Sequence, residues 1–342
     1  MNHLSSEQLA ASTELISSAQ KIVITTHKSP DGDAIGSSLG LFHVLLGLGK
    51  QVNVIVPDEI PSYLLWLKGT SSVVVFEKER QRGWELIQEA DLIFSLDYNS
   101  LGRVGEELET HLRKASAPFI LIDHHQQPEQ YAKVIYSDTS ASSTAEMIYC
   151  FATELGWKNY ISVDAAEAIY CGIMTDSGSF RFPAVTAQTH IIAADLMALG
   201  LDHAKVHREV YDTNLLDRLR LVGYALNEKL EVLPECGTAF IALSKEELYR
   251  FNHRSGDTEG LVNQALSISG VKLAAFFREG NNEVKISFRS KGSFDVNQFA
   301  RNGWNGGGHR NAAGGRSTLS LDETIARFKA EVEEICHQIT ES

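Results

Sequence analysis

One loop organises the first half of the chain, and it reads Thr25-Thr26-His27-Lys28-Ser29-Pro30-Asp31-Gly32-Asp33-Ala34. Residues 21–24 before it form an apolar run bounded like a buried strand, and residues 34–48 after it have the pattern of a helix. A histidine and two carboxylates therefore follow the carboxyl end of a strand, where open α/β sheets bind ligands. Imidazole and carboxylate suit a divalent metal. An aspartate that only caps the helix explains the stretch equally well, so the loop alone leaves both alternatives open.

Strands and helices alternate through the remainder of the first half. Further strands are expected at residues 51–56, 72–76, 91–96, 118–122 and 134–136, and helices at 5–20, 79–89, 102–116, 144–155 and 163–175. This alternation predicts an α/β fold with a mostly parallel sheet flanked by helices. We interpret residues 1–186 as one domain.

The pattern changes in the second half. Residues 187–227 are helical throughout and read as a connector between domains. Strands follow at 237–243, 271–278 and 283–290, the last two joined by a hairpin turn, with short helices at 245–250, 259–266 and 296–301 and a final helix at 321–339. Residues 228–342 are therefore expected to form a smaller α+β domain.

Composition excludes several classes of protein. The 342 residues carry a net charge of −13, which argues against binding duplex DNA through a basic surface. No apolar run of about 20 residues and no secretory signal is visible, so a membrane location is not expected. The four scattered cysteines suit reduced thiols better than disulfides, which predicts a cytoplasmic protein. Nothing in the sequence indicates a protein partner.

The charge is unevenly distributed. From Asn227 onward there are 14 Lys and Arg against 16 Asp and Glu, so the preceding part carries −11. Within residues 285–316 there are six basic residues and a single acid, Asp295. An acidic first part and a locally basic later segment would suit a metal site and a phosphate-holding surface, although ordinary surface variation also produces such a difference.

Acids and histidines follow three of the expected strands, at positions that parallel strands bring to one sheet edge. They are His27, Asp31, Asp33, Asp97, His124 and His125, and Asp176 at a helix end would return to the same edge. Clustered carboxylates repel one another and raise their pKa values, and two divalent cations would remove that problem. Two metals about 3.5–4 Å apart polarise a phosphate and activate a water molecule.

Four further motifs accompany the first loop in the order and spacing of a known family. They are Asp97-Tyr98-Asn99-Ser100-Leu101-Gly102-Arg103, Asp123-His124-His125, Thr175-Asp176-Ser177-Gly178 and Gly306-Gly307-Gly308-His309-Arg310-Asn311-Ala312-Ala313-Gly314-Gly315. Together with His27-x-x-x-Asp31-x-Asp33, they resemble the DHH phosphoesterase superfamily, and the glycine-rich motif resembles that of the DHH-associated substrate domain. The resemblance covers nearly the whole chain.

The resemblance implies two divalent metal ions. One would be held by His27, Asp31 and Asp97, and the other by Asp33, Asp97, His124 and Asp176, with Asp97 bridging. Manganese is the usual metal of similar proteins. Carboxylate and imidazole also bind magnesium, cobalt and zinc, which stay open.

The resemblance also implies catalytic and substrate-binding roles. His125, with Asp31 and Asp123, is expected in the catalytic group, His125 contacting the scissile phosphate and Asp123 orienting an imidazole. Arg103 would reach a phosphate, or is a surface arginine. Substrate contacts in the second domain are expected from Arg289, Gly307, Gly308, His309 and Asn311, with the glycine-rich loop bringing backbone amides close to an anion.

Two other patterns favour a structural explanation. Gly32, Gly36 and Gly40 are spaced for close helix packing, and no phosphate-binding loop motif occurs. Ser143 followed by Glu146 is typical of a helix cap, although a helix N-terminus can also hold a phosphate.

The compact two-domain organisation favours one group within the superfamily. It resembles the nanoRNases, hydrolases that degrade very short oligoribonucleotides and dephosphorylate 3′-phosphoadenosine 5′-phosphate. The alternatives are a cyclic or linear dinucleotide phosphodiesterase and, more distantly, a non-catalytic nucleotide sensor. A sensor would need a lost metal ligand, and every expected ligand position is filled.

Overall fold

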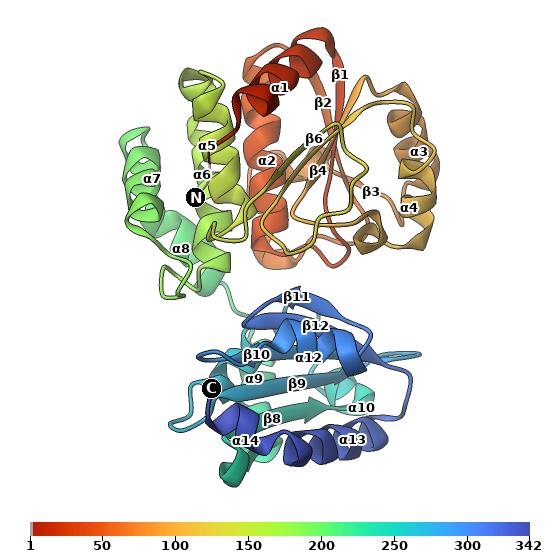
Figure 1. Ribbon diagram of the computed structural model, residues 1–342, viewed down its shortest axis with the longest axis vertical. Helices are drawn as coiled ribbons and strands as arrows, with labels where there is room; N and C mark the ends of the chain where they lie inside the picture. The colour runs from red at the N-terminus through yellow and green to blue at the C-terminus, as the bar shows by residue number, and fades with distance from the viewer. Residues whose placement is uncertain (1–2) are drawn as a thin grey trace. The chain divides into compact units, whose positions relative to one another are not determined.

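The computed structural model describes residues 3–342, which divide into two compact units, residues 3–213 and 214–342 (Figure 1). The division falls inside the stretch expected to be a connector. Helices α7 (Ala187–Ala198) and α8 (His203–Tyr211) belong to the first unit, and α9 (Leu216–Glu228) belongs to the second. No helix among residues 3–342 is long and apolar enough to cross a membrane.

The first unit is built on a six-stranded parallel sheet with the order β3-β2-β1-β4-β5-β6. Its strands are β1 (Lys21–Thr25), β2 (Gln51–Val56), β3 (Val74–Val75), β4 (Leu92–Leu96), β5 (Phe119–Asp123) and β6 (Val134–Ser137). Every residue of β4 and β5 is buried, as expected of a parallel sheet covered on both faces. The predicted α/β fold is confirmed.

Helices cover both faces of this sheet (Figure 1). One face packs against α2 (Gly32–Gly47), α5 (Thr144–Glu154) and α6 (Val163–Asp176), with α1 (Ser6–Ser18) beside β6. The other packs against α3 (Arg80–Glu89) and α4 (Glu106–Leu112). The helix predicted over 102–116 is shorter than expected: α4 begins after a 3₁₀ turn, Leu101–Val104, because Gly105 between them has a φ of 88°.

Close packing of α2 against α6 explains the glycines of α2. A side chain added at Gly32 would meet Thr175, one at Gly36 would meet the backbone of Ala168 and Gly172, and one at Gly40 would meet Ile169. The interpretation of this spacing as helix packing is confirmed.

The second unit contains a mixed six-stranded sheet with the order β11-β12-β10-β9-β8-β7. Its strands are β7 (Leu230–Leu233), β8 (Thr238–Leu243), β9 (Leu273–Glu279), β10 (Val284–Ser290), β11 (Gly307–His309) and β12 (Ala312–Ser317). Only β8 and β9 pair in parallel. Strand β7 and the hairpin β11–β12 were not predicted. The glycine-rich stretch is therefore largely strand, where a loop was expected.

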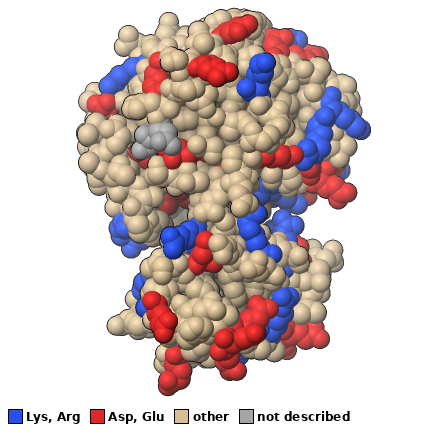
Figure 2. Space-filling view, in the orientation of Figure 1, with Lys and Arg blue, Asp and Glu red and all other residues tan. Residues whose placement is uncertain are grey.

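Two groups of helices pack on this second sheet. Helices α12 (Val296–Gly303) and α13 (Leu321–Glu334) cover one face, and α9, α10 (Lys245–Arg250) and α11 (Leu261–Leu266) pack on β8 and β9 from the other. The final predicted helix is interrupted at Ile335, before α14 (Cys336–Thr340). On the face drawn in Figure 2, acidic and basic side chains are interspersed over the first unit.

The prediction of four reduced thiols is wrong for one pair. Cys236 and Cys336 form a disulfide within the second unit, and Cys150 and Cys171 are buried thiols. The two bonded residues are 100 positions apart, so sequence spacing gave no indication that the fold brings them together.

The α2–α6 contact can be tested by adding one methyl group. In Gly36→Ala the new Cβ would lie 2.6 Å from the Ala168 carbonyl oxygen and 2.7 Å from the Gly172 nitrogen. We expect overpacking to lower the free energy of unfolding by about 1–3 kcal/mol, measured by thermal or urea denaturation. Gly223→Ala in α9 is the matched control, because its Cβ meets no atom within 4 Å and alanine favours a helix. Equal stability of the two variants would contradict the packing argument.

Candidate metal centre

The loop after β1 brings two of the expected ligands together. The Asp31 carboxylate caps α2 by accepting from the backbone nitrogens of Asp33 and Ala34, at 3.0 and 3.1 Å. His27 is buried, and its Nδ1 lies 3.0 Å from the Lys28 carbonyl oxygen, which leaves Nε2 facing the carboxylates. Nε2 is 3.3 Å from Asp97 and 3.9 Å from Asp31. Asp31 therefore both caps the helix and belongs to the cluster.

Asp97 lies at the centre of the cluster, immediately after β4. Its Oδ2 faces His27, and its Oδ1 lies 3.6 Å from His124 Nε2. Its backbone has a φ of 63°, a left-handed conformation that aspartate tolerates better than most residues. Its amide donates to the Ile122 carbonyl of β5, which fixes the residue between two strands. The two carboxylate oxygens of Asp97 thus point to two different groups of donors.

The second group of donors comprises Asp33, His124 and Asp176. His124 Nε2 lies 3.7 Å from Asp33 and 3.5 Å from Asp176, the last residue of α6. The Asp33 carboxylate accepts two short backbone hydrogen bonds, from Thr144 N at 2.6 Å and Ala145 N at 2.8 Å. These amides begin α5, so this helix N-terminus binds a carboxylate of the chain itself. Ser143 caps the helix as predicted.

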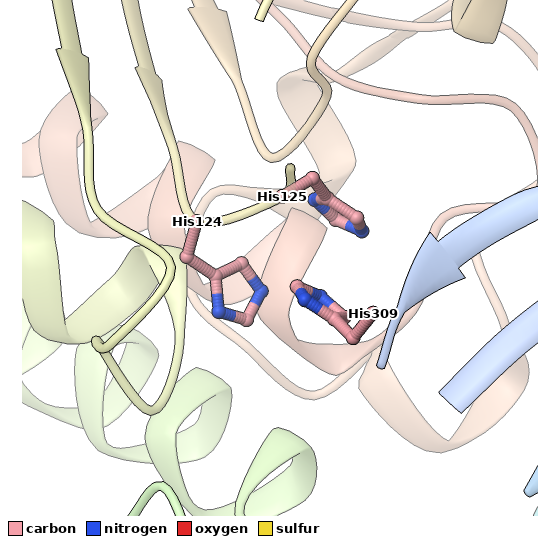
Figure 3. A group of neighbouring side chains, drawn as sticks. All are labelled: His124, His125 and His309. Atoms are coloured by element: carbon pink, nitrogen blue, oxygen red, sulfur yellow. The ribbon is translucent and has the colours of Figure 1, made fainter. Parts of the chain in front are cut away.

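Asp123 and His125 form a third pair beside the donors. Asp123 is fully buried, and its Oδ1 lies 2.7 Å from His125 Nδ1 while its Oδ2 accepts from the His125 amide at 3.1 Å. The rings of His124 and His125 are nearly perpendicular, with centroids 5.1 Å apart (Figure 3). Asp123 thus orients His125 through Nδ1. His309, also labelled in Figure 3, belongs to β11 of the second unit.

The electrostatics of the cluster favour a cation. Burial raises the pKa of Asp33 well above its usual range, and the charges of Asp97, Asp176 and Asp31 raise it further. Burial would lower the pKa of His27, but Asp97 and Asp31 outweigh it and raise that pKa. Burial also raises the pKa of Asp123 to about 6 and lowers that of His125 well below its usual range. Divalent cations would relieve the repulsion among the buried carboxylates.

The donor atoms fit such cations. His27, Asp31 and Asp97 offer atoms within 4.8 Å of one another, and so do Asp33, His124 and Asp176. Carboxylate oxygen with some imidazole is the ligand set of hard and borderline divalent metals, and it does not select one of them. All six expected ligands are therefore gathered in the first unit.

Two neighbours of the cluster complete its description. Arg103 is half-buried in the 3₁₀ turn, and its charge lowers the pKa values of both Asp123 and His125, which places its guanidinium within electrostatic reach of them. Thr144 was missed: its hydroxyl donates to Asp97 Oδ1 at 3.0 Å. The only signal for it was its place at the start of a helix, which also suited capping.

The expected substrate residues of the second unit lie at one end of its sheet. Arg289 is on β10, Gly307 and His309 are on β11, and Asn311 is in the following turn. The Gly308 amide donates to Asn297 Oδ1 at 3.0 Å, so this amide is engaged within the protein. The Asn311 side chain donates to Ser290 Oγ and to the Gly292 carbonyl, which gives it a structural role. Substrate contacts by these residues stay a prediction.

Comparison with known proteins places both units in described families. Residues 21–173 match the DHH family, N-terminal domain, and residues 239–338 match the DHHA1 domain. The chain is 31% identical over 332 residues to the bifunctional oligoribonuclease and PAP phosphatase NrnA of Bacillus subtilis, covering 95% of this chain and 99% of that protein.

Two further similarities are informative. A crystal structure of an exopolyphosphatase-related protein from Bacteroides fragilis is 37% identical and superposes with a TM-score of 0.93 over 99% of both chains. The cyclic-di-AMP phosphodiesterase GdpP of Bacillus subtilis is 27% identical over 94% of this chain, which spans 49% of that longer protein.

The metal centre can be tested by protein stability. We expect Mn²⁺ to raise the melting temperature, because a ligand at about 100 times its Kd stabilises the native state by about 2.7 kcal/mol. Asp97→Asn keeps the shape of a side chain that faces both donor groups, and should lose most of this shift while folding without metal. Asp164→Asn, a carboxylate in the first turn of α6 outside the cluster, should retain the shift. An undiminished shift in Asp97→Asn would contradict the assignment.

Thr144→Val tests whether the residue behind the donors positions Asp97. The valine keeps the shape but removes the hydroxyl that donates to Asp97 Oδ1. We expect Mn²⁺ affinity to fall by roughly 10–100-fold, measured by isothermal titration calorimetry. Thr153→Val is the control on the same helix, because the Thr153 hydroxyl donates only to carbonyls of α5. Equal affinities in the two variants would show that the Thr144 hydroxyl is dispensable.

Proposed function

The chain belongs to the DHH family and is a hydrolase, and we propose that it hydrolyses very short oligoribonucleotides to mononucleotides and 3′-phosphoadenosine 5′-phosphate to AMP. The observation that carries this proposal is the similarity to an oligoribonuclease and PAP phosphatase along the whole chain, including both units. The gathering of all six expected metal donors in one cluster supports it.

We further propose that the cluster holds two divalent cations, with manganese as the first candidate. His27, Asp31 and Asp97 would bind one, and Asp33, Asp97, His124 and Asp176 the other, consistent with the two orientations of the Asp97 oxygens. When bound, such a pair supplies Lewis acidity at the phosphate and a water molecule of lowered pKa. The protein itself contributes the fixed positions of these donors.

His125 is the chain's own proton-handling group in this proposal. Asp123 binds its Nδ1 at 2.7 Å, so the ring is held in one orientation and Nε2 is the nitrogen that faces substrate. The buried ring is neutral before substrate binds, since its pKa is well below the usual range. The charge of a phosphate would favour protonation of Nε2, and Asp123 would stabilise the imidazolium that donates to the leaving oxygen.

Arg103 and the second unit are proposed to bind other parts of the substrate. Arg103, whose charge acts on Asp123 and His125, would contact a phosphate near the metal donors. Arg289, His309 and the glycines of β11 would hold the distal phosphate or terminal nucleotide. At Gly308 the missing side chain is required by the hairpin itself, because a Cβ there would lie 2.5 Å from the Ala312 carbonyl oxygen.

A second candidate function is the hydrolysis of cyclic or linear dinucleotides. The similarity to a cyclic-di-AMP phosphodiesterase over nearly the whole chain favours including these substrates in any test. A non-catalytic nucleotide sensor is disfavoured because none of the metal-donor positions is altered.

The decisive assay offers several substrates in parallel. Purified protein with Mn²⁺ would receive a ladder of two- to five-residue RNAs, 3′-phosphoadenosine 5′-phosphate, cyclic diadenylate and pyrophosphate. We expect stepwise release of mononucleotides from the RNAs and formation of AMP, both lost in Asp97→Asn. Hydrolysis of pyrophosphate alone would contradict the proposed substrates. If the metal-loaded protein hydrolysed none of these compounds, the proposal that it is active on nucleotides would be contradicted.

A further inference from the structure

Glu146, in the first turn of α5, makes contacts that helix capping does not explain. In a capping box, a glutamate at this position accepts a hydrogen bond from the backbone nitrogen of the cap residue, which here is Ser143. One oxygen of Glu146 instead reaches a residue further back, and accepts from the Ser142 nitrogen at 2.9 Å and the Ser142 hydroxyl at 2.6 Å. Glu146 therefore fixes a residue that lies outside the helix.

The other oxygen of Glu146 binds a second helix. It accepts from the hydroxyl of Thr189, in the first turn of α7, at 3.0 Å. Glu146 is only 2% exposed, and Ser142 and Thr189 are buried with it. Burying a carboxyl group is costly unless its oxygens are hydrogen-bonded. The three hydrogen bonds offset that cost and hold the side chain in one place.

The segment that Glu146 holds determines which nitrogen of His124 can bind a metal. The carbonyl oxygen of Ala141, the residue before Ser142, lies 3.3 Å from His124 Nδ1. A carbonyl oxygen can only accept, so this contact places a proton on Nδ1 and leaves the lone pair of the neutral ring on Nε2. Nε2 is the atom that faces the carboxylates of the second donor group. Displacement of Ser142 would move this carbonyl and release the ring.

The same segment holds two carboxylates of the cluster. The amides of Thr144 and Ala145 bind Asp33 at 2.6 and 2.8 Å. The Thr144 hydroxyl binds Asp97 Oδ1 at 3.0 Å, and this is the oxygen of Asp97 that faces His124. Residues 141–145 therefore contact three of the four donors expected at the second metal position.

The donors of the first metal position are held by a different part of the chain. His27 Nδ1 lies 3.0 Å from the Lys28 carbonyl oxygen, and Asp31 accepts from the first amides of α2. Within residues 3–342, neither side chain hydrogen-bonds to residues 141–146. A change at Glu146 should therefore affect the two positions unequally.

We propose that Glu146 is a positioning residue that sets the affinity of the metal position formed by Asp33, His124 and Asp176, and leaves the position formed by His27 and Asp31 largely unaffected. The inference rests on the proposed two-cation centre. Glu146 acts through residues 141–145, and it is placed to touch neither a metal ion nor a substrate. Loss of its hydrogen bonds would free the segment that orients His124 and Asp33.

The test is a Mn²⁺ titration of the full-length Glu146→Gln variant, followed by electron paramagnetic resonance. Glutamine keeps the shape but replaces one acceptor oxygen with a donor, so one side of the link between Ser142 and Thr189 is lost. Two Mn²⁺ ions about 3.5–4 Å apart are magnetically coupled in the wild type. In the variant, the affinity for one of the two ions should fall about tenfold. At intermediate Mn²⁺ concentration, the coupled signal should then give way to that of an isolated ion.

Two further variants make this measurement specific. Glu154→Gln is the matched control, because Glu154 lies on the same helix and also binds a backbone amide, that of Leu4 at 2.9 Å, and it should keep the coupled signal. Ser142→Ala removes only the hydroxyl contact with Glu146. It should weaken the same metal position to a smaller extent, and it provides the test if Glu146→Gln does not fold.

The outcomes separate this inference from the proposed function. A coupled signal in Glu146→Gln and Ser142→Ala as strong as in Glu154→Gln would overturn the positioning role, and so would an equal loss of affinity for both ions. A wild type that binds two coupled ions but hydrolyses none of the proposed substrates would overturn the function and leave the role of Glu146 intact. A wild type that binds a single ion would overturn the two-cation centre and this inference together.

Discussion

The hydrogen bonds between the Asp33 carboxylate and the first amides of α5 are the contact on which the candidate site depends. Asp33 is a buried carboxyl group that also faces three other carboxylates, and burial and these charges raise its pKa. The amides of Thr144 and Ala145 lie at the positive end of a helix and bind it at 2.6 and 2.8 Å. They fix the start of α2 against the start of α5, and so position Asp31, Asp33 and Thr144 together.

The parallel sheet supplies the rest of the geometry. Strands β1, β4 and β5 are neighbours and run in the same direction, so His27, Asp97 and His124 emerge at one edge although they are far apart in sequence. Asp97 is held in a left-handed backbone conformation between β1 and β5, which turns its two oxygens toward both groups of donors. The acids are tolerated at this density because each is bound by backbone amides, a histidine or a hydroxyl.

The sequence predicted the features that depend on residues close together in the chain, and it missed those that depend on distant residues. The strands and helices that carry the metal donors have strong hydrophobic periodicity. Because the carboxyl ends of parallel strands meet at one edge of the sheet, the sequence predicted that these donors would cluster. Thr144 was missed because its contact with Asp97 joins residues 47 positions apart. The β11–β12 hairpin was missed because glycine lacks strand propensity and the pairing to β10 supplies the stability. The Cys236–Cys336 bond was missed because the two residues are 100 positions apart in the sequence.

The two sheets can present functional groups in different places because their strands are patterned differently. In β4 and β5 every residue is buried, both faces are covered by helices, and the polar groups of the site are confined to Asp123 at the end of β5 and to the residues that follow each strand. In β10 buried and partly exposed residues alternate strictly, so one face forms core and the other carries Lys285, Ser287 and Arg289. The first arrangement concentrates donors at a point, which suits metal ions. The second spreads polar side chains along one face of a strand.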